Sequence, residues 1–94
     1  MAWTLVYTSS AGRAIRRLDP GIRRRVFAAL EKLQAEPERG KPLQLTLKGL
    51  RSWRTGDYRI VYRVIETRIE ILVVALCHRR DVYEKLQKTL SKRG

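Results

Sequence analysis

The sequence is poor in the residues that build disulfides, metal centres and acid–base sites. It contains one cysteine, Cys77, and one histidine, His78, among 94 residues. A single cysteine excludes an internal disulfide and a cysteine-based zinc cluster. No Gly-rich phosphate loop, Ser/His/Asp arrangement or placed pair of carboxylates indicates conventional hydrolase chemistry. We therefore expect no metal and no cofactor, and a function that depends on arginine, tyrosine and the one histidine.

Long hydrophobic runs are also missing. The N-terminal stretch MAWTLVYTSS lacks the apolar core of a signal peptide. The apolar stretch IEILVVALC has the length of a strand and is too short for a helix that spans a bilayer. These absences predict a soluble cytoplasmic protein without a membrane partner. The length predicts one domain, residues 1–94, with one modest core.

Acidic residues are scarce, with 9 Asp and Glu against 21 Lys and Arg and a formal charge of +12. Such a chain repels itself unless something acidic neutralises it, and nucleic acid, an acidic protein or an anionic membrane would do so. The apolar content of 44% is too high, and too periodic, for a disordered basic tail. The chain is therefore expected to fold and to bind an acidic partner.

The first half of the chain predicts a strand followed by two helices. Residues 3–8 are β-rich, and Ser9 and Ser10 can cap a helix. Asp19 before Pro20 is typical of the start of a second helix. The apolar positions of these helices are Ala14, Ile15, Leu18, Ile22, Val26, Ala29, Leu30 and Leu33. Two consecutive amphipathic helices should pack as a hairpin, and residues 35–49, rich in proline and glycine, should form the longest loop.

Residues 50–77 predict three antiparallel strands joined by two-residue turns at 56–57 and 66–67. The first turn sets Arg54 opposite Arg59, and the second sets Arg63 opposite Glu70. The face expected under the helices carries Trp53, Ile60, Tyr62, Val64, Ile69, Ile71, Val73 and Ala75. The other face carries Arg54, Arg59, Val61, Arg63, Leu72 and Val74.

Two arginines directly opposite each other on adjacent strands destabilise the pair, by up to about 1 kcal/mol. An anion bound between Arg54 and Arg59 would remove that cost. Solvation of both side chains, or an ion pair with Asp57 or Glu70, would explain the pair equally well. The register alone does not decide between a binding site and a solvated surface.

The C-terminal segment CHRRDVYEKLQKTLSKRG predicts a last helix capped by Asp81. Its apolar stripe would consist of Val82, Leu86 and Leu90. His78, Arg79 and Arg80 would lie where the last strand ends, beside the arginine-bearing face.

The motifs R-x-GDYR-x-x-Y (54–62) and HRRDVY (78–83), in this order in a small basic chain, resemble the RelE/ParE superfamily of toxins from bacterial type II toxin-antitoxin systems. The resemblance covers essentially the whole length. It implies an α+β fold in which an N-terminal strand and a helical hairpin pack on a small antiparallel sheet, with a short C-terminal helix.

A RelE-like member would be a metal-independent mRNA endonuclease that acts in the ribosomal A site. The resemblance places its phosphate-contacting arginines on Arg59 and Arg79, with Arg80 as a near alternative, and its C-terminal tyrosine on Tyr83. Some members carry lysines where this chain has Leu50 and Ser52. Charge at the RNA would then come from Lys48, Arg51 and Arg54.

These arginine, tyrosine and histidine side chains suit RNA cleavage in which the 2′-hydroxyl of the substrate itself is the nucleophile. Arginine remains protonated at neutral pH and can hold a phosphate with two hydrogen bonds. Tyr83 beside guanidinium groups would be the general base, while Arg59 and Arg79 clamp the phosphate. His78 would either transfer a proton, or only bond a carbonyl or stack on a base. Trp53 and Tyr62 are expected in the core.

Two other functions remain open. A ParE-like toxin with the same fold would inhibit DNA gyrase without chemistry of its own, because the fold does not fix the function. A basic module of this kind could also bind RNA without cutting it. In the RelE-like case the expected partners are the ribosome, mRNA and a RelB-like antitoxin. That antitoxin would offer an acidic or amphipathic segment that folds on binding.

Overall fold

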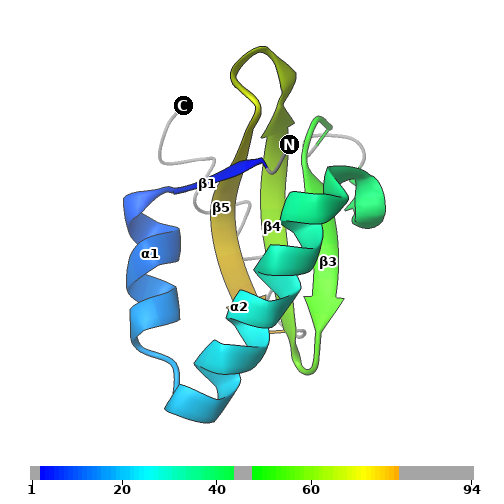
Figure 1. Cartoon of the computed structure of the whole chain (residues 1–94). Helices are drawn as coiled ribbons and strands as arrows, with labels where there is room; N and C mark the ends of the chain where they lie inside the picture. The colour runs from blue at the N-terminus through cyan, green and yellow to red at the C-terminus, as the bar shows by residue number, and fades with distance from the viewer. Residues whose placement is uncertain (1–2, 44–47, 79–94) are drawn as a thin grey trace.

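The computed structural model describes residues 3–43 and 48–78 (Figure 1). Its elements are β1 (Thr4–Tyr7), α1 (Ser9–Arg16), α2 (Pro20–Ala35), the 3₁₀ turn η1 (Pro37–Arg39), β2 (Lys41–Pro42), β3 (Arg51–Thr55), β4 (Tyr58–Ile65), the 3₁₀ turn η3 (Glu66–Arg68) and β5 (Glu70–His78). Both helices lie on one face of the sheet, so the predicted α+β arrangement is confirmed. The expected C-terminal helix, with Asp81, Val82, Leu86 and Leu90, lies outside the described residues.

The strands form one sheet in the order β1-β5-β4-β3-β2. The pairs from β2 to β5 are antiparallel, but β1 runs parallel to β5. The three antiparallel strands expected over residues 50–77 are confirmed, and β1 adds a parallel strand at the edge, so the sheet is mixed. The helical hairpin after β1 makes this possible, because parallel neighbours need a long crossover connection. The segment 35–49, predicted as one long loop, also contains η1 and the short strand β2.

Thr8, not Ser9 or Ser10, caps α1, and that prediction was wrong. The Thr8 hydroxyl accepts a hydrogen bond from the Ala11 N–H at 3.1 Å and donates one to the Val74 carbonyl at 2.9 Å. The same side chain therefore satisfies a free donor of the helix and ties α1 to β5. α2 begins as predicted, with Asp19 at its N-cap and Pro20 at the first helical position.

The main core lies between the helices and the sheet. Its buried members are Ala11, Ile15, Val26, Ala29, Leu30, Leu33, Ile60, Tyr62, Ile71, Val73 and Leu76. Each fully buried large aliphatic side chain contributes about 1.5–3 kcal/mol relative to exposure. Trp53 packs half-buried against this core, as predicted, and the predicted apolar face of α2 is confirmed.

The register of the first hairpin is confirmed, whereas that of the second was wrong. Arg54 pairs with Arg59 as expected. In the second hairpin Ile65 pairs with Glu70, and Arg63 therefore opposes Leu72 instead of Glu70. The reason is a four-residue connection, in which η3 is followed by a residue in the left-handed region, Ile69, with φ 52° and ψ 48°.

A β-bulge shifts the second half of β5. Val61 pairs with Ala75 and Tyr62 pairs with Val73, so Val74 is the extra residue. Beyond this point the faces of β5 exchange relative to the predicted alternation. Leu76 joins the main core, while Ala75, which was expected there, packs on the second face. Ile69 was also expected in the core but its side chain is 42% exposed.

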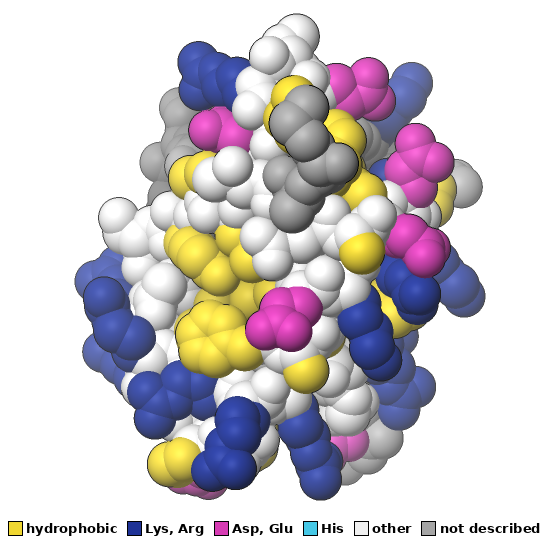
Figure 2. All heavy atoms as spheres, viewed as in Figure 1, with side chains coloured by type: hydrophobic (Ala, Val, Ile, Leu, Met, Phe, Trp, Pro, Cys, Tyr) yellow, Lys and Arg dark blue, Asp and Glu magenta, His cyan; other side chains and the backbone are white. Residues whose placement is uncertain are grey.

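Charge is unevenly spread over the helical side of the molecule. In Figure 2 most of the visible acidic side chains lie in the upper half of the view, and Lys and Arg side chains surround the lower half. Within residues 3–43 and 48–78, no helix has the length and apolar character that crossing a bilayer requires.

Candidate nucleic-acid interface

The turn between β3 and β4 places two arginines side by side. Gly56 adopts φ 60°. The two-residue turns that join most hairpins require such a positive φ, which glycine adopts without steric cost. Thr55 then pairs with Tyr58, and the next pair is Arg54 with Arg59. The Nε of Arg54 donates a hydrogen bond to the Gly56 carbonyl at 3.1 Å, so its guanidinium is held next to the turn.

Arg59 lies half-buried in the middle of three strands. It is flanked by Arg54 on β3 and by Cys77 on β5. Next along this second face of the sheet is a small apolar cluster of Leu50, Val61, Ala75 and Cys77. The residue Arg59 thus lies beside a packed apolar part of the sheet. Glu70 cannot pair with it, since Glu70 opposes Ile65 at the other end of β4.

A second pair of cations lies at the other end of this face. Arg63 is exposed and shares its face with Arg59, because residues two and four apart on a strand point the same way. A Cβ built on Gly49 would lie 3.8 Å from Nη2 of Arg63, which places Arg63 beside the turn that carries the exposed Lys48. We call Lys48, Arg54, Arg59 and Arg63 the cationic face. Arg63 was not among the predicted site residues, although its place in the alternation indicated it.

Arg51 has a structural partner. Its Nη1 donates hydrogen bonds to the carbonyls of Glu38 at 3.2 Å and Gly40 at 2.8 Å. It pairs with Tyr62, a core residue, and so faces the helical side. The predicted contact of Arg51 with RNA stays a prediction, and the described geometry separates this side chain from the cationic face.

His78 ends β5 as expected but faces the helical side of the sheet. It pairs with Tyr58, and the two rings meet edge to face with centroids 5.6 Å apart. Tyr58 packs against the main core. His78 and Arg59 therefore project from opposite faces near the same end of the sheet, and a proton-transfer role for His78 beside Arg59 is not supported by this arrangement.

The Ser52 hydroxyl is a buried polar atom on the second face. Ser52 opposes Val61 and is 6% exposed, and its Oγ has no hydrogen-bond partner among the described residues. A buried hydroxyl without a partner costs about 1–3 kcal/mol. The resemblance to the superfamily aligned lysines of some members with this position, where the present chain has a short neutral side chain.

Tyr7 and Tyr62 do not offer a base. Burial raises the pKa of Tyr7, and burial also raises the pKa of Tyr62 against the smaller lowering effects of the Gly40 N–H and the Arg51 charge. Both phenols are therefore protonated at neutral pH. In this part of the chain the cationic face can bind and polarise a phosphate but supplies no proton acceptor.

The family model described as "ParE toxin of type II toxin-antitoxin system, parDE" matches residues 5–83. The chain belongs to this toxin family. The resemblance found in the GDYR and HRRDVY motifs is thereby confirmed, and the protein is a toxin of a type II toxin-antitoxin system.

Two curated toxins of Mycobacterium tuberculosis are similar to this one. Toxin RelG is 36% identical over 87 residues, which cover 90% of this chain and 100% of RelG. Toxin RelE is 40% identical over 75 residues, which cover 72% of this chain and 74% of that toxin. Both carry RelE-type names, although the family model carries the ParE name. The relatives therefore place the toxin on the RelE side of the superfamily.

Solved structures agree with the fold. A chain in the toxin-antitoxin complex RelBE2 of Mycobacterium tuberculosis has a TM-score of 0.77 and 34% identity, covering 84% of this toxin and all of that chain. The isolated RelE toxin of E. coli has a TM-score of 0.72 at 22% identity, covering 95% of this toxin and 99% of that chain. The second likeness concerns the fold alone.

Three predicted site residues of the toxin, Arg79, Arg80 and Tyr83, lie outside the described residues. Of the other five, Arg54, Arg59 and Lys48 belong to the cationic face, whereas Arg51 and His78 face the helical side. No group of three His, Cys, Asp or Glu side chains within the described ranges is placed to hold a metal ion.

Proposed function

We propose that this toxin is a ribosome-dependent mRNA endonuclease that makes the RNA cleave itself. The observation that carries the proposal is the Arg54–Arg59 pair on the second face of the sheet, in a chain related to toxins named RelG and RelE. A phosphate bound between the two guanidinium groups would relieve their repulsion. The cost of this like-charge pair in the free toxin would be offset when such an anion binds.

The proposed reaction needs only orientation, charge stabilisation and two proton transfers. The 2′-oxygen attacks the adjacent phosphorus and loses its proton to a base, while the bond from phosphorus to the 5′-oxygen breaks. The leaving 5′-oxygen takes up a proton, and a 2′,3′-cyclic phosphate remains on the upstream fragment. Arg59, together with Arg79, would hold the phosphate and stabilise its added charge. Tyr83 would accept the proton of the 2′-hydroxyl.

A translation extract tests this proposal directly. Wild-type toxin is expected to produce mRNA 5′ ends in phase with codons. Arg59→Ala should lower the cleavage rate by about 100-fold, as the loss of one preorganised donor does elsewhere, and Tyr83→Phe by about 100-fold or more. Primer extension on the extracted mRNA measures both rates.

Arg24→Ala is the matched control, since it removes one exposed arginine from α2 and should leave cleavage unchanged. Equal loss of cleavage in Arg24→Ala and Arg59→Ala would contradict the assignment of the site. Full activity of the Arg59→Ala, Tyr83→Phe double variant would contradict the mechanism.

The ParE family match favours a second candidate, inhibition of DNA gyrase without chemistry. Supercoiling assays with purified gyrase, run beside the translation extract, separate the two functions. Gyrase inhibition or DNA breaks without codon-phased mRNA ends would establish this candidate and reject the endonuclease.

We also propose a cognate antitoxin that covers the cationic face with an acidic or amphipathic segment. The basis is charge complementarity with a +12 chain. The solved relatives include the RelBE2 complex and an archaeal RelE-RelB complex from Pyrococcus horikoshii. Reversal of the charge at Arg54 and Arg63 to glutamate should weaken this complex. Unchanged affinity in that double variant would place the antitoxin on another surface.

A further inference from the structure

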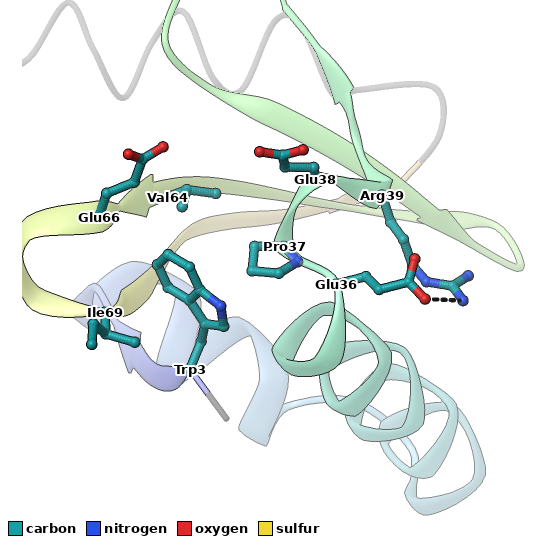
Figure 3. A pocket seen from close by; sticks show the side chains of 8 residues that line it. All are labelled: Trp3, Glu36, Pro37, Glu38, Arg39, Val64, Glu66 and Ile69. Carbon is teal, nitrogen blue, oxygen red and sulfur yellow. Dashed lines mark hydrogen bonds and ion pairs between the residues drawn. The ribbon is translucent and has the colours of Figure 1, made fainter. Parts of the chain in front are cut away.

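A cavity of about 560 Å³ lies on the helical side of the sheet, opposite the cationic face, between the end of α2, η1 and the connection from β4 to β5 (Figure 3). Its apolar lining consists of Trp3, Pro37, Val64 and Ile69. The indole of Trp3 lies between Ile69 and Pro37. Glu66 of this cavity comes seven positions after Arg59, which is roughly 23 Å along an extended strand. The cavity is therefore not part of the proposed RNA site.

The rim of the cavity is acidic, against the charge of the rest of the molecule. Glu36, Glu38 and Glu66 line it, which are three of the nine acidic residues in a chain of net charge +12. Arg39 neutralises Glu36 at 3.4 Å. Glu38 and Glu66 are exposed and make no ion pair with another described residue. Two carboxylates thus remain available beside an apolar floor. We call this site the acid-rimmed pocket.

The walls of the pocket are fixed before any ligand binds. The hydroxyl of Tyr62 donates to the Pro37 carbonyl at 2.6 Å and accepts from the Gly40 N–H at 2.9 Å. Arg51 holds the Glu38 and Gly40 carbonyls from the same side. A ligand therefore need not order the segment that carries Glu38, which lowers the entropic cost of binding.

The Trp3 side of the pocket is anchored equally well. Gln34, in the last turn of α2, donates a hydrogen bond from its side-chain Nε2 to the Trp3 carbonyl at 2.9 Å. The backbone carbonyl of Gln34 accepts a hydrogen bond from the Trp3 N–H at 3.5 Å. The Thr4 N–H donates to the Ile69 carbonyl at 3.0 Å, which joins Trp3 to the opposite wall. The indole and the Ile69 side chain are thus presented by hydrogen-bonded backbone.

We propose that the acid-rimmed pocket binds an arginine side chain on a basic segment of a partner protein. An arginine stem is apolar and packs on indole and aliphatic surface, while its guanidinium pairs with carboxylates and is attracted to the face of an indole. The pocket offers all three features in Trp3, Glu38 and Glu66. A second copy of the toxin is disfavoured as the occupant, because two chains of charge +12 repel each other. An acidic segment would be repelled from this rim and attracted to the cationic face.

Nuclear magnetic resonance of the full-length toxin, with ¹⁵N-labelled tryptophan, tests the proposal. The chain has two tryptophans, and Trp3→Phe assigns the indole N–H signals. Titration with a short peptide of alternating leucine and arginine should shift the Trp3 signal saturably and leave the Trp53 signal in place. A peptide of the same length with glutamate for arginine should cause no shift.

Removal of the rim charge should weaken the binding of the arginine peptide. Glu38→Gln and Glu66→Gln are each expected to raise its dissociation constant about threefold, and the double variant about tenfold, as for exposed ion pairs. Glu31→Gln removes the same charge from an exposed position on α2 outside the pocket and should change nothing.

Three results would overturn the proposal. The first is the absence of a saturable Trp3 shift with the arginine peptide, and the second is an equal effect of Glu31→Gln and Glu66→Gln. The third is a Trp3 shift that follows toxin concentration without peptide, which would make the pocket a self-association surface. None of these results bears on mRNA cleavage, so this proposal and the endonuclease proposal fail separately.

Discussion

At the scale of single residues, Tyr62 fixes a distant turn from inside the core. Its side chain is fully buried, yet its hydroxyl both donates to Pro37 and accepts from Gly40. Gly40 must be glycine for this contact, because a Cβ there would lie 2.5 Å from the Tyr62 hydroxyl oxygen. One phenol therefore determines the path of η1 and the position of the carboxylates beside it.

Tyr62→Phe is expected to lower the free energy of unfolding by about 1–3 kcal/mol. The substitution keeps the ring but leaves the buried Gly40 N–H and Pro37 carbonyl without this partner. Urea denaturation at pH 7 measures the change. Tyr58→Phe, which keeps the ring contact with His78, serves as the control and should change stability far less. Equal stability of the Tyr62→Phe variant and the wild type would show that η1 does not depend on this hydroxyl.

The dependence of stability on alkaline pH follows from the same residue. Burial raises the pKa of Tyr62 above its ordinary value near 10, so the folded state holds this proton more tightly than the unfolded state. Its contribution is present below pH 10 and is lost as the pH rises through the folded pKa. Wild-type toxin should therefore lose more stability than Tyr62→Phe between about pH 9 and pH 11. Denaturation curves at both pH values measure this, and parallel losses would contradict the prediction.

Some of the candidate site could be predicted residue by residue, and some could not. The Arg54–Arg59 pair followed from a two-residue turn at Gly56, which is a local property of the sequence. The partners of Arg51 are carbonyls of a segment more than ten residues earlier, and no local pattern encodes that approach. The edge-to-face contact of His78 depends on the shifted register of β5, which is also non-local.

At the scale of elements, β5 shows why hydrophobic patterning fixed the helices but not the second hairpin. The helices are apolar on one side only, so their buried faces could be read from spacing. β5 is largely buried on both faces, and its run ILVVALC contains no polar alternation that would pin the register. The connection before it offered no glycine or asparagine to mark the left-handed position that Ile69 occupies.

Thr8 links the bulge of β5 to the start of α1, and this link is testable. Thr8→Val keeps the shape of the side chain but removes its hydroxyl bonds with Ala11 and Val74. We expect a loss of about 1–2 kcal/mol in the free energy of unfolding, as for the removal of a helix cap. Thermal or urea denaturation gives the value.

Ser9→Ala is the control for the Thr8 variant. Ser9 is exposed, and it makes no capping bond within the described part of the chain. Its substitution should shift stability by no more than about 0.5 kcal/mol. If Ser9→Ala lowered the free energy of unfolding more than Thr8→Val does, Ser9 would be the helix cap, as the sequence predicted.

At the scale of the whole molecule, charge is separated by location. The cationic face carries four cations on and beside one face of the sheet, whereas three carboxylates gather at the pocket on the helical side. The cationic face would attract an anionic partner and the acid-rimmed pocket a cationic one, so the two proposed partners need not compete for the same surface. The net charge of +12 alone does not reveal that cationic and acidic side chains occupy separate surfaces.

Binding of the toxin to mRNA-programmed ribosomes should depend steeply on salt. Four phosphate contacts at about 0.7 released counterions each give a slope near −3 for log K against log salt concentration. Affinity should then fall roughly 50-fold between 50 and 200 mM salt. Lys48→Ala should make the slope shallower by about 0.7 without affecting stability. Sedimentation with ribosomes at several salt concentrations measures the slope, and a flat response would contradict a phosphate-dominated interface.

The two-residue strand β2 has a consequence for the behaviour of the free toxin. It covers the outer side of β3 with Lys41 and Pro42, a charged side chain and a residue without an N–H. An edge that ends in lysine and proline is a poor template for another chain's backbone. We therefore expect concentrated toxin to resist fibril growth from this border of the sheet.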